Sequence, residues 1–310
     1  MKNGTDYMVR ATAYGGRVRA FAIDATTVVG ELHRRQGTEP AVTAALGRLA
    51  TGALLFGATL KEPGHQVTLR IQADGPAGTL LAAATGEGDV RGLVGNPRTE
   101  VDQVRNGKLN VSGVVGTRGR LTVTRELGLR QPYIGVVEIV SGEVGEDLAH
   151  YMVSSEQTPS AVGIGVFVRP DGSVEAAGGY MVQLLPGVSD AAAAAIEAVV
   201  RELPHPTTML RSGDSPEDIL ARIFPGGVEP QGRTPVRFHC PCSIERVERA
   251  LLLLGEAALR EILDNDADRG ETEVVCEFCT ERYALTPARV RELAHEAASR
   301  NGGHRRAAGG

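Results

Sequence analysis

Hydrophobic and polar residues alternate along short segments in the first two thirds of the chain, and a period of two residues predicts β-strands. The alternation over residues 9–24 runs through Gly15-Gly16 and therefore predicts a β-hairpin. Val67, Leu69 and Ile71 alternate with polar residues and predict a half-buried strand. We expect further strands at 78–84, 90–94, 120–125, 134–140, 162–169 and 174–184, because turns rich in Gly, Pro and Asn separate these segments.

Apolar residues follow the helical period over 26–36, 40–60 and 146–155. The second segment carries little charge, but Arg48 lies near its middle, so it spans a bilayer poorly and we expect a core helix. Strands that follow one another, with the helices grouped elsewhere, indicate the α+β fold class. We expect a mixed α/β domain in the N-terminal part of the chain.

The pattern changes after Pro186-Gly187. Ser189 and Asp190 can cap a helix over 191–203, which opens with five alanines. Alanine favours helices but buries little apolar area, so this helix should form readily and dock weakly. A short helix at 216–223 and a flexible connector over 224–235 should follow.

These segments divide the chain into four parts. We predict a first domain over 1–180, a metastable helical linker over 181–231, a small domain over 232–298 and a disordered tail over 299–310, rich in Gly and Arg. In the small domain, Ser243 can cap a helix that runs to about Leu263, followed by a polar turn at 264–270 and a helix over 287–298.

The composition is that of an ordinary globular protein of 310 residues, with 42% hydrophobic and 23% charged residues. A net charge of −5 gives no reason to expect a nucleic-acid partner. The N-terminal residues are not followed by an apolar segment that would serve as a signal peptide. We therefore expect a cytoplasmic protein, in a reducing compartment and without a membrane partner.

All four cysteines lie in the last quarter of the chain, as the close pairs Cys240-Pro241-Cys242 and Cys276-Glu277-Phe278-Cys279. Four thiolates at about 2.3 Å from one ion form a closed tetrahedral zinc site. The same sulfurs can instead form two disulfides between near neighbours. In a reducing compartment such a cluster favours metal binding or redox chemistry over permanent disulfides.

Other interpretations of the cysteines stay open. Buried structural cysteines are disfavoured by the Pro and charged neighbours, whereas a static zinc ribbon is a serious competitor that usually repeats Cys-x-x-Cys twice. A ribbon that binds nucleic acid should carry a basic patch, and a thiol–disulfide oxidoreductase would need one pair rather than two. His239 adjoins Cys240 and could replace a ligand, but four thiols already complete the set.

Motifs for enzymatic activity are missing from the sequence. It contains no phosphate-binding loop, no His-Glu-x-x-His and no nucleophile elbow. Residues 264–268 begin like a calcium loop, but Arg269 stands where that loop requires glycine. We therefore expect no catalytic residues and no enzymatic activity.

Cys-x-Cys, then about thirty residues and Cys-x-x-Cys near the C-terminus resembles the heat-shock protein 33 family, bacterial holdase chaperones regulated by redox state. The other segments that resemble the family are Arg91-Gly92 with Gly95-Asn96-Pro97, Tyr151 with 154–160, 177–180 with 183–187, and 238–243. Leu93 departs from the pattern, because an aromatic residue is usual there, and the spacer between the cysteine pairs is long.

The resemblance implies a substrate-binding and dimerising domain, a metastable linker and a C-terminal zinc domain with four cysteine ligands. It assigns one zinc ion per chain to Cys240, Cys242, Cys276 and Cys279 in the reduced state. It implies an ATP-independent holdase that is dormant when zinc-bound, becomes active and dimeric on oxidation, and keeps unfolding client proteins from aggregating. On oxidation we expect Cys276–Cys279 and Cys240–Cys242 disulfides, because near neighbours can pair without large chain movement.

Overall fold

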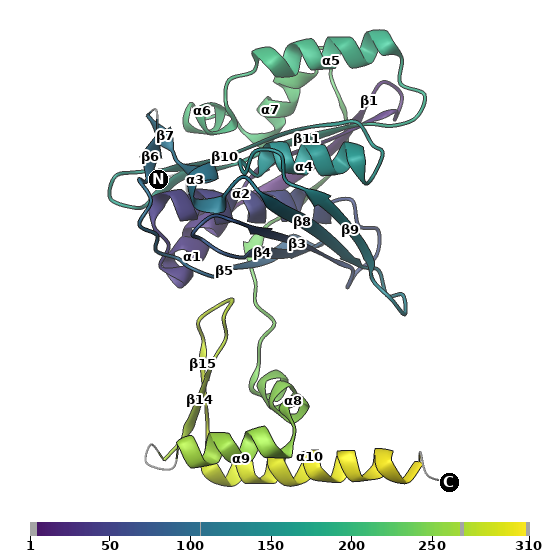
Figure 1. The fold of residues 1–310 in the computed structure, drawn as a ribbon. Coiled ribbons are helices and arrows are strands. Elements are labelled where there is room, and N and C mark those ends of the chain that lie inside the picture. The colour runs from purple at the N-terminus through teal and green to yellow at the C-terminus, as the bar shows by residue number, and fades with distance from the viewer. Residues whose placement is uncertain (1–4, 106, 267–269, 308–310) are drawn as a thin grey trace. The chain divides into compact units, whose positions relative to one another are not determined.

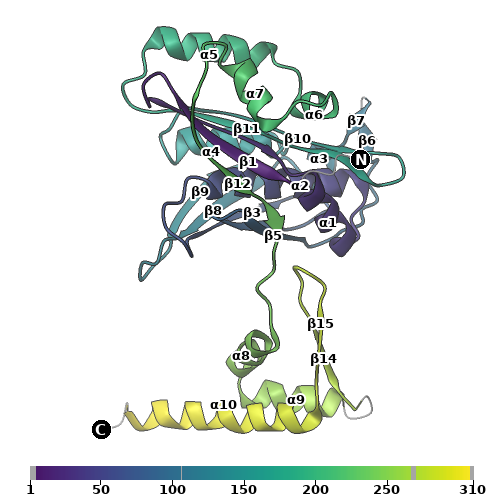
Figure 2. The same ribbon diagram turned by 180° about the vertical axis from the view of Figure 1, so that it is seen from behind.

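The computed structural model describes residues 5–105, 107–266 and 270–307, and side chains to residue 299. Contacts within the chain divide it into two compact units, Met1–His239 and Cys240–Gly310 (Figures 1 and 2). The mixture of helices and sheets confirms the predicted α+β class. The predicted limits of the domains and the linker stay predictions.

A five-stranded antiparallel sheet forms one layer of the first unit. Its strands, in spatial order, are β10 (Ser160–Val168), β11 (Val174–Leu184), β2 (Val18–Asp24), β1 (Tyr7–Ala13) and β12 (Glu229–Pro235). β1 and β2 pair from Tyr7 opposite Asp24 to Ala13 opposite Val18, and the turn between them uses positive φ at Gly15 and Gly16. This confirms the predicted hairpin.

The second layer is a six-stranded sheet. Its strands, in spatial order, are β13 (Arg237–Phe238), β5 (Asp89–Val94), β4 (Leu80–Thr85), β3 (Gln66–Ala73), β8 (Gly119–Glu126) and β9 (Tyr133–Glu138). All pairs are antiparallel except β13 with β5. The predicted strands in this part of the chain are confirmed, with ends displaced by one or two residues.

The longer helices that contribute to the main core next to these sheets are α1 (Thr26–Gln36), α2 (Pro40–Gly57) and α4 (Gly145–Ser154). α2 contacts strands of both sheets, as Figure 1 shows. By length and composition α2 is apolar enough to cross a membrane, but 89% of its residues are buried in this unit. The prediction of a core helix is therefore confirmed. Short elements that the pattern did not predict are β6 (Val104–Arg105), β7 (Lys108–Leu109) and α3 (Val111–Val115).

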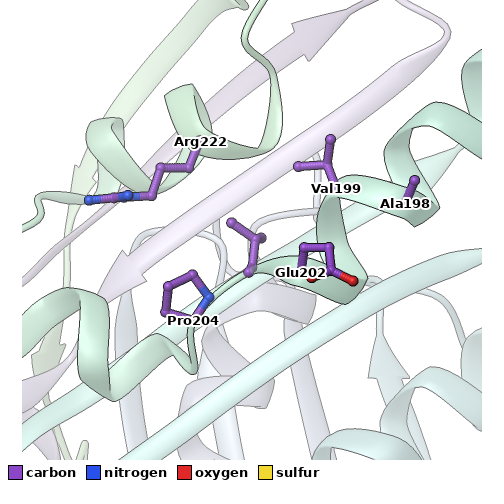
Figure 3. A pocket seen from close by; sticks show the side chains of 6 residues that line it. Ala198, Val199, Glu202, Pro204 and Arg222 are labelled. Carbon is purple, nitrogen blue, oxygen red and sulfur yellow. The ribbon is translucent and has the colours of Figure 1, made fainter.

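Helices α5 (Asp190–Glu202), α6 (Pro206–Arg211) and α7 (Pro216–Ile223) belong to the first unit and are buried to different extents. Of the thirteen residues of α5, Ala192 and Ile196 are the buried ones. Figure 3 shows an open hollow where Val199 and Glu202 of α5 and Arg222 of α7 line the same space. The alanine-rich helix α5 thus buries few residues, and its weak docking stays a prediction.

Helix α7 is packed more tightly than α5. Half of its eight residues are buried, and Ile219, Leu220 and Ile223 join a second core on the five-stranded sheet. Ser215 and Asp218 form a capping box at its start. The stability of the predicted linker is therefore uneven along its length.

The flexible connector predicted over 224–235 is wrong in its second half. Residues 229–235 form strand β12, which pairs antiparallel with β1 at the edge of the sheet. Pro230 and Pro235 concealed it, since proline argues against a central strand but is tolerated at an edge. Its residues are almost all exposed, so the backbone of β1 holds this strand in place rather than apolar packing.

The second unit contains α8 (Ile244–Leu254), α9 (Glu256–Asn265), β14 (Thr272–Val275), β15 (Arg282–Leu285) and α10 (Pro287–Ala307). The single helix predicted from Ser243 to Leu263 is wrong, because Gly255 adopts a φ of 86° and ends α8 there. α10 continues to Ala307, through much of the segment predicted to be a tail. Residues 267–269 of the predicted polar turn and 308–310 lie outside the described residues.

Candidate metal centre

A β-hairpin positions the second cysteine pair. β14 ends at Val275 and β15 begins at Arg282, so Cys276 and Cys279 lie in the turn between them. The Cys276 N–H donates to the Glu281 carbonyl at 2.9 Å, and the Thr280 N–H donates to the Cys276 carbonyl at 2.8 Å. Thr280 has a φ of 60°, which is unusual for a β-branched residue. The tight turn thereby brings two sulfurs into one small region.

The first pair lies directly before helix α8. Ser243 follows Cys242, and its hydroxyl accepts the Arg246 N–H as the N-cap of this helix. Pro241 restricts the backbone between the two cysteines. The short spacing and the start of α8 together fix the positions of the Cys240 and Cys242 side chains.

All four sulfur atoms lie within 4.8 Å of one another. Cys240 Sγ is 3.7 Å from Cys276 Sγ, and Cys242 Sγ is 3.1 Å from Cys279 Sγ. The four are free thiols, and Cys279 is the buried member. Each cysteine of the first pair therefore contacts one cysteine of the second pair, and the four sulfurs form one cluster. His239 is not part of this group.

The cluster is chemically suited to hold a metal ion. Four thiols offer soft ligands, the complete set for a closed tetrahedral site. Sulfurs at 2.3 Å from a central ion would lie about 3.8 Å apart, close to the observed Cys240–Cys276 distance of 3.7 Å. The four cysteines are therefore positioned to hold a metal ion.

The thiols differ in acidity because their surroundings differ. Burial raises the pKa of the Cys240 thiol. Burial, and then the hydrogen bond with Cys242, raises the pKa of Cys279. Burial also acts on Cys242, but hydrogen bonds from Tyr283 and Cys279 outweigh it and lower the pKa of Cys242. Cys242 consequently ionises more readily than Cys240 and Cys279.

Tyr283 contacts the cysteine cluster, although the sequence did not indicate it. Its hydroxyl donates a hydrogen bond to Cys242 Sγ at 3.1 Å, and this bond raises the pKa of the tyrosine. Tyr283 lies on β15, opposite Val274 of β14. A tyrosine four residues after the last cysteine carries no motif, because its contact depends on the register of the hairpin and on the first pair.

The second unit has a small apolar core next to this cluster. Its buried members come from α8, α9, β15 and α10 and are Leu251, Leu259, Leu285, Val290, Leu293, Ala294 and Ala297. Arg289 of α10 forms a two-pronged ion pair with Glu248 of α8, at 2.7 and 2.8 Å. Among the described residues this unit thus depends on few buried side chains. The cysteine cluster also brings the segment before α8 together with the β14–β15 turn.

Comparisons with known proteins agree with this architecture. Residues 6–286 match the family model described as "Hsp33 protein". The "33 kDa chaperonin" of Bacillus subtilis is 44% identical over 288 residues, covering 93% of this chain and 98% of the relative. That of Shouchella clausii is 43% identical over 296 residues, covering 95% and 99%. The crystal structure of the 33 kDa chaperonin (heat shock protein 33 homolog) from Thermotoga maritima superposes with a TM-score of 0.86 at 34% identity, covering 96% and 100%.

Proposed function

Because this chain belongs to the Hsp33 protein family, a family of chaperones, we propose that it is a redox-regulated, ATP-independent holdase. In this proposal it is dormant when reduced and zinc-bound, and oxidation of its cysteines activates it. The observation that carries the proposal is the cluster of four sulfurs within 4.8 Å, built from two pairs that are each close in sequence.

Cys240, Cys242, Cys276 and Cys279 are the proposed ligands, and zinc is the proposed metal. When bound, zinc would cross-link the segment before α8 to the β14–β15 hairpin, and structural zinc contributes about 10–16 kcal/mol in small domains. The low pKa of Cys242 and the hydrogen bond from Tyr283 favour the thiolate that such a ligand must be. The surroundings of Cys242 thus favour the ionised form that binds a metal ion.

The proposed oxidation joins near neighbours, Cys276 with Cys279 and Cys240 with Cys242. Formation of each disulfide removes two electrons and two protons from two thiols. One molecule of hydrogen peroxide accepts them and becomes two molecules of water. A disulfide across one intervening residue is strained, so Cys276–Cys279 should form first. Both disulfides are local, and therefore neither replaces the link between the two cysteine pairs.

Loss of that link leaves the second unit with its small core, which is marginal for a domain of this size. We propose that this unit then unfolds and that the linker of residues 181–231 is released from the first unit. α5 should leave first, since Ala192 and Ile196 are its buried residues, whereas α7 leaves last. Release uncovers an apolar sheet face that includes Val9, Val18 and Ala20, a surface suited to unfolding clients.

The remaining parts of the proposal concern surroundings and assembly. The protein acts in the cytoplasm, binds unfolding client proteins, dimerises on activation and does not require nucleic acid or a membrane. It carries no catalytic residues and is not an enzyme. Binding without turnover needs no nucleotide, and the sequence contains no nucleotide-binding motif.

The decisive experiment measures zinc and holdase activity on the same protein. Reduced protein should contain one zinc per chain and should not suppress aggregation of a chemically unfolded enzyme. Peroxide should release the zinc and switch suppression on, and peptide mapping should find the two local disulfides. Zinc-free reduced protein, zinc retained by Cys240→Ala with Cys279→Ala, or a dominant Cys242–Cys276 cross-link would refute the assignment.

The linker step has its own test. Ile196→Asp places a charge at a buried position of α5 and should release the helix while zinc stays bound. Ala194→Asp is the matched control, because Ala194 is exposed on the same helix. Reduced Ile196→Asp protein should suppress aggregation, and the control should not. Rapid hydrogen exchange in the linker without activity would assign client binding to the unfolded second unit instead.

A further inference from the structure

A groove of about 1330 Å³ in the first unit has no part in the redox proposal. It follows strand β10, the edge strand of the five-stranded sheet, and is bordered by α2, by the β6–β7 hairpin and by the connector between α5 and α6. It is large enough to hold several residues of an extended chain. All its lining residues belong to the first unit, and residues 203–208 among them lie in the proposed linker, so the groove is complete only while that linker is docked.

The edge of β10 that borders the groove carries unpaired backbone groups, although Ile164 and Val166 are themselves buried. The Leu184 N–H donates to the Pro159 carbonyl, so the Pro159 carbonyl faces β11. Because these groups alternate along a strand, the N–H and C=O groups of Val162, Ile164 and Val166 face away from β11. No hydrogen bond engages them among the described residues, and all three residues line the groove. Such an edge can accept another strand by backbone pairing.

Glycines in β10 keep side chains out of this space. A Cβ on Gly163 would lie 2.5 Å from the Tyr180 ring, and one on Gly165 would collide with the His205 imidazole. Tyr180 and His205 can therefore pack directly against the strand, and both line the groove. Nδ1 of His205 lies 2.9 Å from the Thr207 hydroxyl and 3.4 Å from the Thr207 backbone nitrogen.

The charges of the groove are mainly positive. The cationic residues that line it are Arg48, Arg105, Lys108 and Arg169, and the acidic ones are Glu143 and Glu146. Glu143 is engaged by Arg48, whose side chain is 14% exposed and whose buried Nε has no partner in the described part of the chain. Neither Arg105 nor Lys108 has an ion pair among the described residues. Burial and the charges of Arg48 and Lys108 lower the pKa of His205, as expected where positive charge is in excess.

We propose that this groove binds an extended acidic peptide segment of another protein, which pairs with the edge of β10 and places a carboxylate near Lys108 and Arg48. Backbone pairing contributes part of the affinity, and the excess of positive charge restricts the groove to acidic segments. The site is complete while α5 and α6 are docked, so it operates in the reduced, zinc-bound protein. Its failure would therefore leave the redox proposal intact.

The test uses a fluorescein-labelled, capped heptapeptide of alternating valine and threonine with one central glutamate, because the chain has no tryptophan to report binding. Fluorescence anisotropy with reduced, zinc-loaded protein should show saturable binding. A glutamine in place of the glutamate should weaken binding about fivefold to tenfold. N-methylation of alternate peptide nitrogens should abolish it, since backbone pairing is blocked. Binding that is absent, or unchanged by either substitution, overturns the proposal.

Protein variants locate the site. Lys108→Gln should weaken binding of the glutamate peptide about fivefold and leave binding of the glutamine peptide unchanged. Lys61→Gln is the matched control, because Lys61 is also exposed but does not line the groove. On binding, hydrogen exchange should slow at residues 162–166. Equal effects of the two lysine variants, or protection confined to another part of the chain, would contradict this location.

Discussion

The two units of this chain are held together by different means. The first unit has a continuous core that extends over both sheets and four helices, and many of its members are completely buried. The second unit has a few buried residues around three helices and one hairpin, together with four sulfurs within 4.8 Å. Burial is insensitive to oxidants, whereas a thiol cluster is not. The same chemical event should therefore unfold one unit and leave the other folded.

The largest effect that separates the two units should come from Cys279→Ala, which removes the buried thiol of the cluster. Zinc affinity should fall by more than the roughly 100-fold that loss of an outer-shell partner costs. Hydrogen exchange over the second unit should become rapid, while exchange in α2 stays slow. His239→Ala is the control and should keep its zinc. If both variants retain zinc equally, the four-thiol site is wrong.

A core substitution should show the reverse pattern. Leu49 of α2 is completely buried, so Leu49→Ala should lower the free energy of unfolding of the first unit by about 4 kcal/mol. Zinc content should not change, because the cluster belongs to the other unit. Leu129→Ala is the matched control in the same unit, since Leu129 is 70% exposed, and it should change stability little. Denaturant unfolding monitored both by circular dichroism and by zinc release would separate the two transitions. A single transition seen by both signals would argue against independent units.

The stability of the first unit should depend on pH through the Asp6 carboxyl. Burial is the main cause that raises the pKa of this carboxyl to about 6. A raised folded-state pKa favours the protonated form, so this contribution to stability is complete below pH 4 and is lost as the pH rises through 6. The loss should amount to about 2–3 kcal/mol and should be absent in Asp6→Asn.

Urea unfolding at a series of pH values measures this dependence. Asp74→Asn is the control of opposite sign, because hydrogen bonds led by the Arg118 N–H lower the pKa of Asp74. Asp74 thus stabilises the unit at higher pH and loses that contribution on acidification. A pH dependence that is identical in wild type and Asp6→Asn would rule out this role for Asp6.

The smallest effect concerns the turn that holds the second cysteine pair. Thr280 has a φ of 60°, a conformation that asparagine tolerates better than a β-branched residue. Thr280→Asn should therefore stabilise the reduced second unit by about 0.5–1 kcal/mol. Thr286→Asn is the control: its hydroxyl accepts the Arg289 N–H, and asparagine caps helices equally well. Thermal unfolding of both zinc-loaded variants makes the comparison, and no gain for Thr280→Asn would mean that the turn is unstrained.

The parts of the fold that the sequence predicted are those where a side-chain pattern decides the structure. The β1–β2 hairpin follows its alternation and its Gly15-Gly16 turn, and α2 follows its apolar period, because burial of apolar side chains holds both in place. Strand β12 could not be predicted, since its side chains are exposed and the backbone of β1 fixes it. The division of the predicted 243–263 helix at Gly255 was also missed, because glycine within a helical pattern is often tolerated.

The candidate site also has parts that a sequence pattern reveals and parts that only the three-dimensional contacts reveal. Four cysteines in two close pairs can be recognised by spacing alone, since metal chemistry requires these residue types. Tyr283 and the crosswise contacts between the pairs depend on how the hairpin and the start of α8 meet. The groove along β10 likewise combines residues from distant segments and has no motif.

The most direct test of the different stabilisation of the two units is hydrogen exchange measured by mass spectrometry on the whole chain, before and after peroxide. We predict that oxidation removes protection from the second unit and from α5, while β1, β2 and α2 keep theirs. Protection that survives throughout the second unit after all four cysteines are oxidised, or that is lost equally from both units, would contradict the account.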